Sequence, residues 1–319
     1  MNGLSELTCS SCLIQNNTAY SDGGGLYTMS SVVSLENVDI RRNEATCGGG
    51  VYSPLDSDLV IVNSLLDSNV ASISGGGLYT NASISCKIYD SVFRNNSALS
   101  ANGGGAYLVS SLTSSNSGRR SAFFSNLSFV DNSAMNGGGG GIFRSGNVSV
   151  TVWNSSFWSN TGLEGGGLYL VNGSSAFTNV SLISNDGLED GGGLIASEEE
   201  SLVMKSCRLR GNSAGEAGGA LHVSHGAQVQ ASGTMYSENV AYGSLVGGGA
   251  LYADTGSTVS CEGDLFESNR ASQGSGGGVY MNGLSELTCS SCLIQNNTAY
   301  SDGGGLYTMS SVEIGRAHV

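Results

Sequence analysis

Residues 93–107 read FRNNSALSANGGGAY, and variants of this stretch recur along the chain. Each copy has an apolar residue three positions before an asparagine, Ala or Gly two positions after it, and then a glycine cluster followed by an apolar and usually an aromatic residue. The third residue of this cluster recurs eleven times at intervals of 25 to 36 residues, most of them close to 27. A period of this length indicates a repeat architecture.

The repeat unit favours strands over helices, because each glycine in a helix interior costs about 1 kcal/mol. The segments between the glycine clusters alternate and are rich in Val, Leu, Ser and Thr, as in residues 32–40 and 148–152. A unit this short cannot bury its inner face alone and must stack on its neighbours. We therefore predict an all-β fold, a parallel β-helix of about eleven rungs. We expect the β-helix to be right-handed, because crossover connections between parallel strands are almost always right-handed.

Stacking in register turns the repeated asparagine into a column. We expect these side chains to form a ladder at a corner, each amide bonding its counterpart in the next rung, with the asparagine itself taking the left-handed backbone of the corner. The predicted structural ladder consists of Asn17, Asn43, Asn69, Asn96, Asn132, Asn160, Asn185, Asn212, Asn239, Asn269 and Asn297.

The residue after the glycine-linked aliphatic forms a second column, and strand alternation predicts that it faces outward. An outward ladder of rings could bind a sugar chain or another protein. The simpler interpretation, which we favour, is that the rings stack on one another and cover the backbone. The candidate binding residues are Tyr27, Tyr52, Tyr79, Tyr107, Phe143, Tyr169, Tyr252, Tyr280 and Tyr307, interrupted by Ile195 and His222.

Charge and composition limit the partners. The chain has 26 acidic and 12 basic residues, for a formal charge of −14, which argues against nucleic acid. It has no run of about 18 apolar residues of the kind that spans a membrane. Cys9 and Cys12 form a Cys-x-x-Cys motif without a second independent pair, so we predict no metal and no cofactor. The sequence does not decide whether Cys9 and Cys12 form a local disulfide, because residues three apart on a strand can be too distant to bridge.

Residues 1–32 recur without change as residues 281–312. We expect residues 1–312 to be a single repeat region and an internal fragment, with Met1 an internal methionine. The identity is either a true tandem repeat or an assembly artefact. Residues 313–319 read as a sequencing-adapter artefact. Rungs without polar caps are expected to associate end to end.

Two motifs resemble the signatures of the polymorphic outer membrane protein repeat, best known from chlamydial surface proteins. The Phe-x-x-Asn element is present at residues 93–96 and 266–269, and the Gly-Gly-Ala-hydrophobic element at residues 218–221. Most rungs depart from the pattern by a third glycine and a following tyrosine. The resemblance implies a secreted or surface-displayed, adhesin-like protein, in the outer membrane if bacterial. Its partners would be glycans or proteins on host or neighbouring cells.

An enzyme is the alternative, because pectin-lyase-like enzymes also use parallel β-helices. Asp186, Glu189 and Asp190 fall in one rung, and His222 and His225 in the next. No Asp-Asp pair, Gly-His-Gly or Arg-Ile-Lys element accompanies them. We therefore predict a non-catalytic adhesin-like or structural rod. A carbohydrate-active enzyme and a non-catalytic glycan-binding module on the same fold remain the alternatives.

Overall fold

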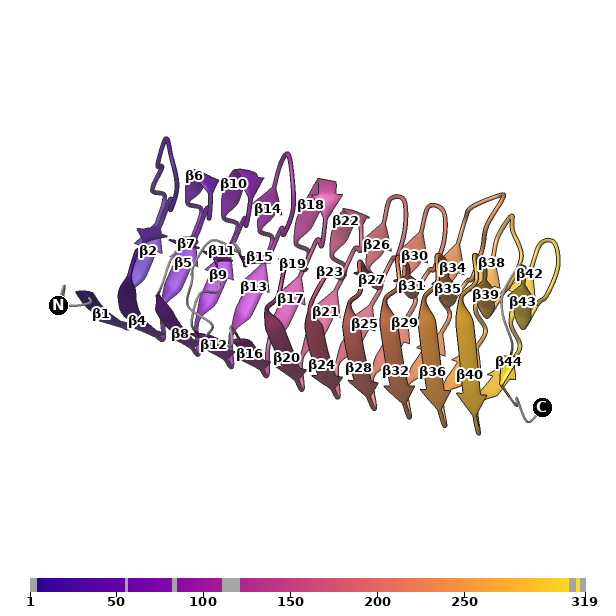
Figure 1. Cartoon of the computed structure of the whole chain (residues 1–319). Coiled ribbons are helices and arrows are strands. Elements are labelled where there is room, and N and C mark those ends of the chain that lie inside the picture. Colours follow the sequence, from indigo (N-terminus) through magenta and orange to yellow (C-terminus); the bar gives the residue numbers. More distant parts are fainter. Residues whose placement is uncertain (1–4, 55–56, 82–84, 111–120, 310–313, 316–319) are drawn as a thin grey trace.

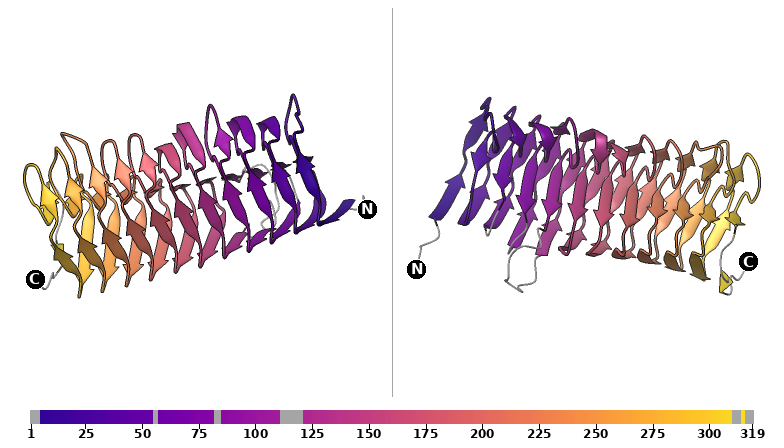
Figure 2. Two further views of the ribbon diagram at one scale, coloured as in Figure 1. Left: turned by 180° about the vertical axis from the view of Figure 1, so that it is seen from behind. Right: turned by 45° about the horizontal axis from the view of Figure 1, so that its top comes forward.

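The computed structural model describes residues 5–54, 57–81, 85–110, 121–309 and 314–315. Over these ranges every named element is a strand, and the strands wind into a rod built from four parallel sheets (Figure 1). The predicted all-β parallel β-solenoid of about eleven turns is confirmed, and its winding is right-handed. The N-terminal and C-terminal rungs lie at opposite ends of the rod (Figure 2).

Each rung passes through the sheets in the order A, B, C and D, and each strand pairs with its counterparts in the rungs on either side. Sheet A consists of β1 (Ser5–Ser10), β4 (Ser31–Glu36), β8 (Asp58–Val62), β12 (Ser85–Tyr89), β16 (Ser121–Ser125), β20 (Ser149–Trp153), β24 (Ser174–Thr178), β28 (Ser201–Lys205), β32 (Gln228–Ser232), β36 (Thr258–Glu262), β40 (Glu286–Ser290) and β44 (Ile314–Gly315). Sheet B consists of β2 (Leu13–Gln15), β5 (Asp39–Arg41), β9 (Leu65–Asp67), β13 (Val92–Arg94), β17 (Ser128–Val130), β21 (Ser156–Trp158), β25 (Ser181–Ile183), β29 (Arg208–Arg210), β33 (Met235–Ser237), β37 (Leu265–Glu267) and β41 (Leu293–Gln295).

The ladder asparagine lies between sheets B and C, and the glycine cluster between sheets C and D. Sheet C consists of β6 (Glu44–Cys47), β10 (Val70–Ser74), β14 (Ser97–Ala98), β18 (Ser133–Gly138), β22 (Thr161–Glu164), β26 (Asp186–Gly187), β30 (Ser213–Ala214), β34 (Val240–Ala241), β38 (Arg270–Ala271) and β42 (Thr298–Ala299). Sheet D consists of β3 (Leu26–Tyr27), β7 (Val51–Ser53), β11 (Leu78–Asn81), β15 (Ala106–Val109), β19 (Ile142–Ser145), β23 (Leu168–Val171), β27 (Leu194–Ser197), β31 (Leu221–Val223), β35 (Leu251–Ala253), β39 (Val279–Met281) and β43 (Leu306–Thr308).

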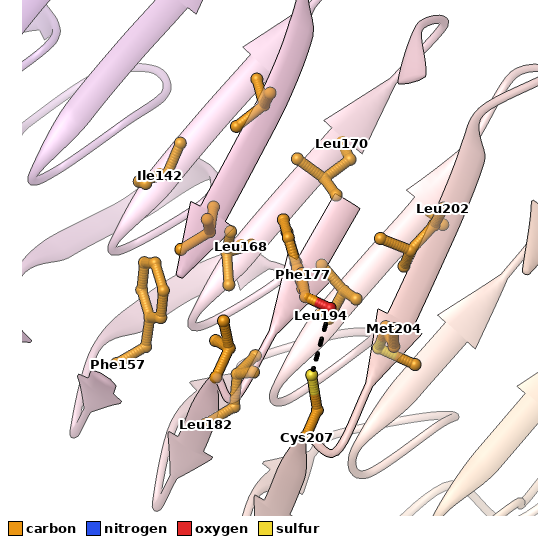
Figure 3. Close-up of a cluster of buried hydrophobic side chains, with 14 of the residues drawn as sticks. Ile142, Phe157, Leu168, Leu170, Phe177, Leu182, Leu194, Leu202, Met204 and Cys207 are labelled. Atoms are coloured by element: carbon orange, nitrogen blue, oxygen red, sulfur yellow. Dashed lines mark hydrogen bonds between the residues drawn. The ribbon is translucent and has the colours of Figure 1, made fainter. Parts of the chain in front are cut away.

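The core is one continuous apolar column inside the sheets (Figure 3). Phe93, Phe129 and Phe157 occupy the same position in successive rungs and stack with centroid distances of 4.6 and 4.9 Å. All three are fully buried, and burying a side chain of this kind contributes about 1.5–3 kcal/mol. The core therefore repeats with the sequence, and each rung packs its apolar side chains against those of its neighbours.

The three glycines of a cluster have different roles, which Gly75, Gly76 and Gly77 illustrate. Gly75 has a φ of +70°, in the left-handed region that side chains other than glycine disfavour. A Cβ on Gly76 would lie 2.5 Å from the carbonyl oxygen of Gly104 and 2.5 Å from backbone atoms of Ser97. A Cβ on Gly77 would lie 2.6 Å from the Gly105 oxygen. The cluster thus combines one conformational requirement with two close approaches between rungs.

Two regions of the sequence lie wholly or partly outside the described residues. The long interval between the glycine clusters of β15 and β19 contains residues 111–120, Asn116 among them, which lie outside the described residues. The register is intact on both sides of it, because Ser85 of β12 pairs with Ser121 of β16. Of the expected artefact tail, Ile314–Gly315 pair with Leu287 and Thr288 of β40.

Candidate functional site

The aromatic column lies on the outer face of sheet D. In its N-terminal half the ring centroids of Tyr27, Tyr52, Tyr79 and Tyr107 follow one another at 5.3, 4.7 and 4.9 Å. The rings therefore lie against one another, the arrangement that we favoured from the sequence. Tyr27 is 50% exposed and the next three are partly exposed, so one edge of this stack meets solvent.

Three rings beyond Tyr107 are buried, which strand alternation did not predict. Phe143, Tyr252 and Tyr280 are 8, 5 and 2% exposed. Ala217 and Val246, from loops that join sheet C to sheet D, pack against the two tyrosines. These rings face away from the core as expected, but a loop shields them from any large ligand. The partly exposed candidate binding residues are Tyr27, Tyr52, Tyr79, Tyr107, Tyr169 and Tyr307.

Burial also determines the protonation of the column. It raises the pKa of Tyr79 and of Tyr252 to about 12, because a phenolate would lose hydration. Both hydroxyls are therefore neutral at physiological pH. The Tyr252 hydroxyl donates a hydrogen bond to Oδ2 of Asp254 at 3.2 Å. The tyrosine stack can offer ring edges and neutral hydroxyl groups to a partner.

The asparagines form a continuous hydrogen-bonded ladder from the first rung to the last, and the ladder is buried from Asn43 to Asn269. Asn96 donates its backbone N–H and its Nδ2 to Oδ1 of Asn132, both at 3.0 Å, and its Nδ2 also donates to the Leu66 carbonyl at 2.9 Å. Its own Oδ1 accepts the same pair of bonds from Asn69. The carbonyl contact explains the apolar-x-x-Asn spacing, since Leu66 is the apolar residue of the preceding rung. The ladder is structural and offers nothing to a ligand.

The expectation that the ladder asparagine itself takes the left-handed backbone is wrong. That conformation belongs to the residue before it, for example Arg42, Ser68 and Asn95, with φ of 51°, 56° and 53°. The ladder asparagine must align its own N–H with the rod axis to bond the next rung. It therefore follows the turn and does not form it.

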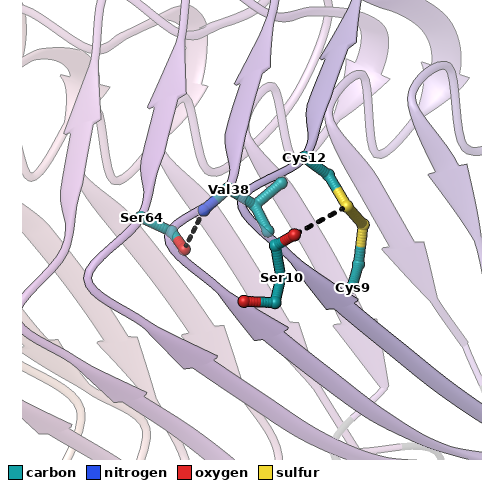
Figure 4. The surroundings of a disulfide bond; sticks show 5 residues. All are labelled: Cys9, Ser10, Cys12, Val38 and Ser64. Carbon is teal, nitrogen blue, oxygen red and sulfur yellow. Dashed lines mark hydrogen bonds between the residues drawn. A yellow bond between two sulfur atoms is a disulfide. The ribbon is translucent and has the colours of Figure 1, made fainter.

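A second hydrogen-bonded column, which the sequence analysis missed, lies at the corner between sheets A and B. The backbone N–H of Val38 donates to Oγ of Ser64 at 3.0 Å (Figure 4). The backbone N–H of Ser64 donates in turn to Oγ of Ser91, also at 3.0 Å. Further along the rod, the Thr234 N–H donates to Oδ1 of Asp264 at 2.7 Å. The corner position thus supplies an acceptor to the preceding rung. Its residue types vary too much for the period to reveal it.

The catalytic candidates of the enzyme alternative are only partly brought together. Nδ1 of His222 lies 3.5 Å from Oδ1 of Asp190, and the same oxygen accepts the Ala217 N–H at 2.9 Å. The His222 ring packs edge-on against Tyr252 at 4.9 Å, as its place in the aromatic column implies. His225 lies apart from this pair, with its Nδ1 3.4 Å from the Ser197 hydroxyl.

Glu164 joins the Asp190–His222 pair, although the sequence did not single it out. Burial raises the pKa of its carboxyl group, and the Tyr169 hydroxyl is hydrogen-bonded to it. Asp186, by contrast, accepts a hydrogen bond from Ser213 at 2.5 Å. The cluster could move a proton, yet its histidine is 9% exposed and packed among rings. A hollow of about 610 Å³ lies at another corner, lined by residues that include Ser145, Asn172 and Glu199.

Beneath that hollow lies a buried ion pair inside the core. Arg144 follows the aromatic column on β19 and points inward, where the apolar Leu108 and Leu170 occupy the neighbouring rungs. Its guanidinium binds Glu200, the Ser175 hydroxyl at 2.8 Å and the Val171 carbonyl. Both charged side chains are fully buried. Pairing offsets part of the cost of burying the charges, although Nε of Arg144 and Oε2 of Glu200 have no hydrogen-bond partner among the described residues.

The cysteines divide into a bridged pair and free thiols. Cys9 and Cys12 form a disulfide with Cα atoms 6.1 Å apart (Figure 4). The turn at Ser11, with φ of 55°, brings them closer than a straight strand would. Cys86 and Cys207 are buried, as expected of small apolar residues. Among the described residues, no group of three or more His, Cys, Asp or Glu side chains is placed to hold a metal ion.

Sequence analysis also missed an aromatic group on the outer face of sheet A. Tyr89, Phe123 and Trp153 come from successive rungs, with centroid distances of 5.7 and 6.2 Å. Trp153 is 49% exposed, and Trp158, on the adjacent sheet B, is 57% exposed. The signal was present, because all four fall at outward positions of alternating strands. These four residues do not recur with the period of the repeat, however, so a search for repeats does not detect them.

A parallel β-solenoid with an asparagine ladder and glycine corners defines a class of repeat proteins, and the comparison with known families identifies the repeat. The model of the Chlamydia polymorphic membrane protein repeat matches residues 11–29 and 291–309. Each match runs from the corner after sheet A, through the ladder asparagine, to the residues after the aromatic column. The chain thus carries polymorphic membrane protein repeats, as the resemblance predicted. Searches of curated proteins and of solved structures found no match.

The matched segments both lie within the duplicated sequence, so they are one sequence found twice. The repeat family and the fold together suggest a surface protein. No helix in the described part of the chain is long and apolar enough to cross a membrane.

Proposed function

We propose that the protein is a non-catalytic rod of the cell surface that acts as an adhesin-like passenger. The observation that carries the proposal is the polymorphic membrane protein repeat on an uninterrupted solenoid. Stacked rungs extend a surface away from its point of attachment, and neighbour-only contacts make such a rod extensible by further repeats. The low content of charged residues, 12%, leaves a surface of Ser, Thr, Asn and rings that favours contact with neutral partners.

The contact surface in this proposal is the partly exposed stack of Tyr27, Tyr52, Tyr79 and Tyr107. Its ring edges and neutral hydroxyls are the groups with which proteins recognise sugar chains and other proteins. The partners would be glycans or proteins on a host or neighbouring cell. The Asp190–His222 pair is the feature that favours the alternative, a carbohydrate-active enzyme.

Binding and turnover experiments distinguish these functions. Fluorescently labelled chain should bind intact cells saturably, and the double variant Tyr52→Ser, Tyr79→Ser should bind more weakly. The matched control is the pair Trp153→Ser, Trp158→Ser, which alters exposed rings elsewhere. Purified chain should release no reducing or unsaturated ends from pectin or polygalacturonate. Release that is abolished by Asp190→Asn or His222→Gln would establish the enzyme in place of the rod, and equal binding by both double variants would remove the tyrosine stack as the contact surface.

A further inference from the structure

The last two complete rungs bring three cysteines together. Cys261 on β36 and Cys289 on β40 are register partners that point into the core, with 1 and 5% of their surface exposed. Cys292 follows at the corner between sheets A and B and is partly exposed. Sγ of Cys292 lies 3.5 Å from the Cys261 carbonyl oxygen, and the Cys261 thiol lies beside both other cysteines. One sulfur thus faces solvent with two more behind it.

The first rung contains the same sequence and serves as an internal reference. Cys9 and Cys12 correspond to Cys289 and Cys292 and are joined by a disulfide. The turn residue between them has a φ of 55° in both copies. The backbone at Cys289 and Cys292 therefore has the conformation that accommodates a bridge. The difference is the third thiol, since Cys9 is paired with Leu35 whereas Cys289 is paired with Cys261.

The surroundings of Cys292 favour its thiolate. Its sulfur occupies the acceptor position of the A–B corner column, beside the Cys261 thiol and the Asp264 backbone, and these neighbours lower the pKa of Cys292 to about 6. While it is protonated, the Cys292 thiol donates to the carbonyl oxygens of Cys261 and Ser290 at 3.5 and 3.6 Å. The contacts with Cys289 and with Cys292 raise the pKa of Cys261, which remains a thiol. The partly exposed sulfur of Cys292 is thus the nucleophile, and the sulfurs of Cys261 and Cys289 lie buried behind it.

We propose that Cys292, Cys289 and Cys261 form a thiol–disulfide exchange site whose substrate is an organic disulfide. The Cys292 thiolate attacks one sulfur of the substrate, which forms a mixed disulfide and releases one thiolate. Cys289 then loses its proton to solvent and attacks the Cys292 sulfur, so that a Cys289–Cys292 disulfide forms and the second substrate thiolate leaves. Two protein thiols are oxidised and one substrate disulfide is reduced to two thiols.

Cys261 gives the site a second product. Its sulfur can attack the Cys292 sulfur in place of Cys289, and the resulting Cys261–Cys292 disulfide joins two neighbouring rungs. A bridge within one rung leaves the rungs held by hydrogen bonds and packing alone, whereas the bridge between rungs adds a covalent link. Two products are possible at this site because a third cysteine is present. At the first rung Cys9 is paired with Leu35, so the corresponding second product cannot form there.

Peptide mapping tests the proposal on the full chain. The reduced protein is exposed to oxidised glutathione, quenched with acid, alkylated and digested with trypsin. Cleavage at Lys and Arg places Cys261 in residues 211–270, Cys289 and Cys292 in residues 271–316, and Cys9 and Cys12 in residues 1–41. A bridge between rungs joins the first two peptides, and a bridge within a rung does not. Buried Cys86 and Cys207 are internal controls for unfolding.

We expect the glutathione adduct to form first at Cys292 and to resolve into one of the two bridges. The double variant Cys261→Ala, Cys289→Ala should accumulate the adduct, and Cys292→Ala should slow thiol loss at the other two cysteines by about tenfold or more. Unchanged rates in Cys292→Ala overturn the proposal. So does a wild-type adduct that persists while Cys261 and Cys289 stay reduced, a result that requires no variant to fold.

Discussion

At the scale of single residues, the same side-chain type has different roles according to its place in the rung. Asn96 is fully buried and makes every hydrogen bond that its amide allows, whereas Asn147 is exposed. Asp264 accepts the Thr234 N–H at a buried corner, where other rungs have Ser, Val or Cys. Substitutions at Asn96 and Asp264 should therefore change the free energy of unfolding more than substitutions of exposed asparagines or aspartates.

Asn96→Leu should lower the free energy of unfolding by about 1–3 kcal/mol. The change leaves the Leu66 carbonyl and the Asn69 amide without their partners inside the core. Thermal and denaturant unfolding midpoints measure the effect. Asn147→Leu is the control on exposed backbone, and we expect it to change stability by less than about 0.5 kcal/mol. Equal losses at the two positions would contradict the assigned repeat frame.

Asp264→Asn should stabilise the rod at alkaline pH. Burial raises the pKa of Asp264 from 3.8 to about 6, so its favourable contribution is complete below pH about 4 and is lost as pH rises through 6. Asparagine keeps the Thr234 hydrogen bond without the charge. The gain over wild type should approach about 3 kcal/mol at pH 8 and vanish near pH 3. Unfolding under reducing conditions across this range measures it, with exposed Asp131→Asn as the control.

At the scale of the element, the glycine cluster connects two strands and also sets the distance between rungs. Gly76 approaches backbone atoms of the next rung on two sides, and a Cβ added to it would lie only 2.5 Å from a carbonyl oxygen. Gly77 has a similar contact, but the chain accepts alanine at the equivalent Ala220 and Ala250. The two neighbouring glycines therefore differ in how far the backbone can adjust.

Gly76→Ala should destabilise the protein by about 1–3 kcal/mol more than Gly77→Ala. The methyl group added at Gly76 meets backbone atoms on both sides. At the position of Gly77 other rungs already contain alanine, which shows that the backbone there can accommodate a methyl group. Unfolding midpoints of the two variants provide the comparison, and no other side chain is altered. A larger loss at Gly77 would mean that alanine at Ala220 and Ala250 depends on local changes absent from other rungs.

At the scale of the whole molecule, the rod has a repeated core with open ends. Ile14 and Ile294, which occupy the same position in the two copies of the duplicated segment, are only partly buried because their rungs lie near the two ends. Among the described residues, the end rungs expose apolar side chains such as Leu7, Leu13 and Leu293, and exposed strand edges of this kind promote association.

The 319-residue chain should therefore associate end to end as concentration rises. Ile14→Lys with Ile294→Lys introduces a charge near each end of the core and should shift the chain towards monomer. Thr8→Lys with Thr288→Lys adds the same charge on the exposed outer face of sheet A and serves as the control. Sedimentation velocity across concentration measures the distribution. A chain that is monomeric before any substitution would show that the end rungs are already protected.

The amino-acid sequence alone determined the fold and its columns, because a parallel solenoid places every repeated residue in register with itself. The period of Asn96 and its counterparts therefore predicted the ladder position and the aromatic column. Only the tertiary structure decided which rings are open, since loops of different length cover Tyr252 and Tyr280 and leave Tyr27 exposed. It likewise placed Cys261 against Cys289 and Cys292 and joined Arg144 to Glu200 across two rungs. These contacts depend on residues that do not recur from rung to rung, and the period of a sequence carries no information about such residues.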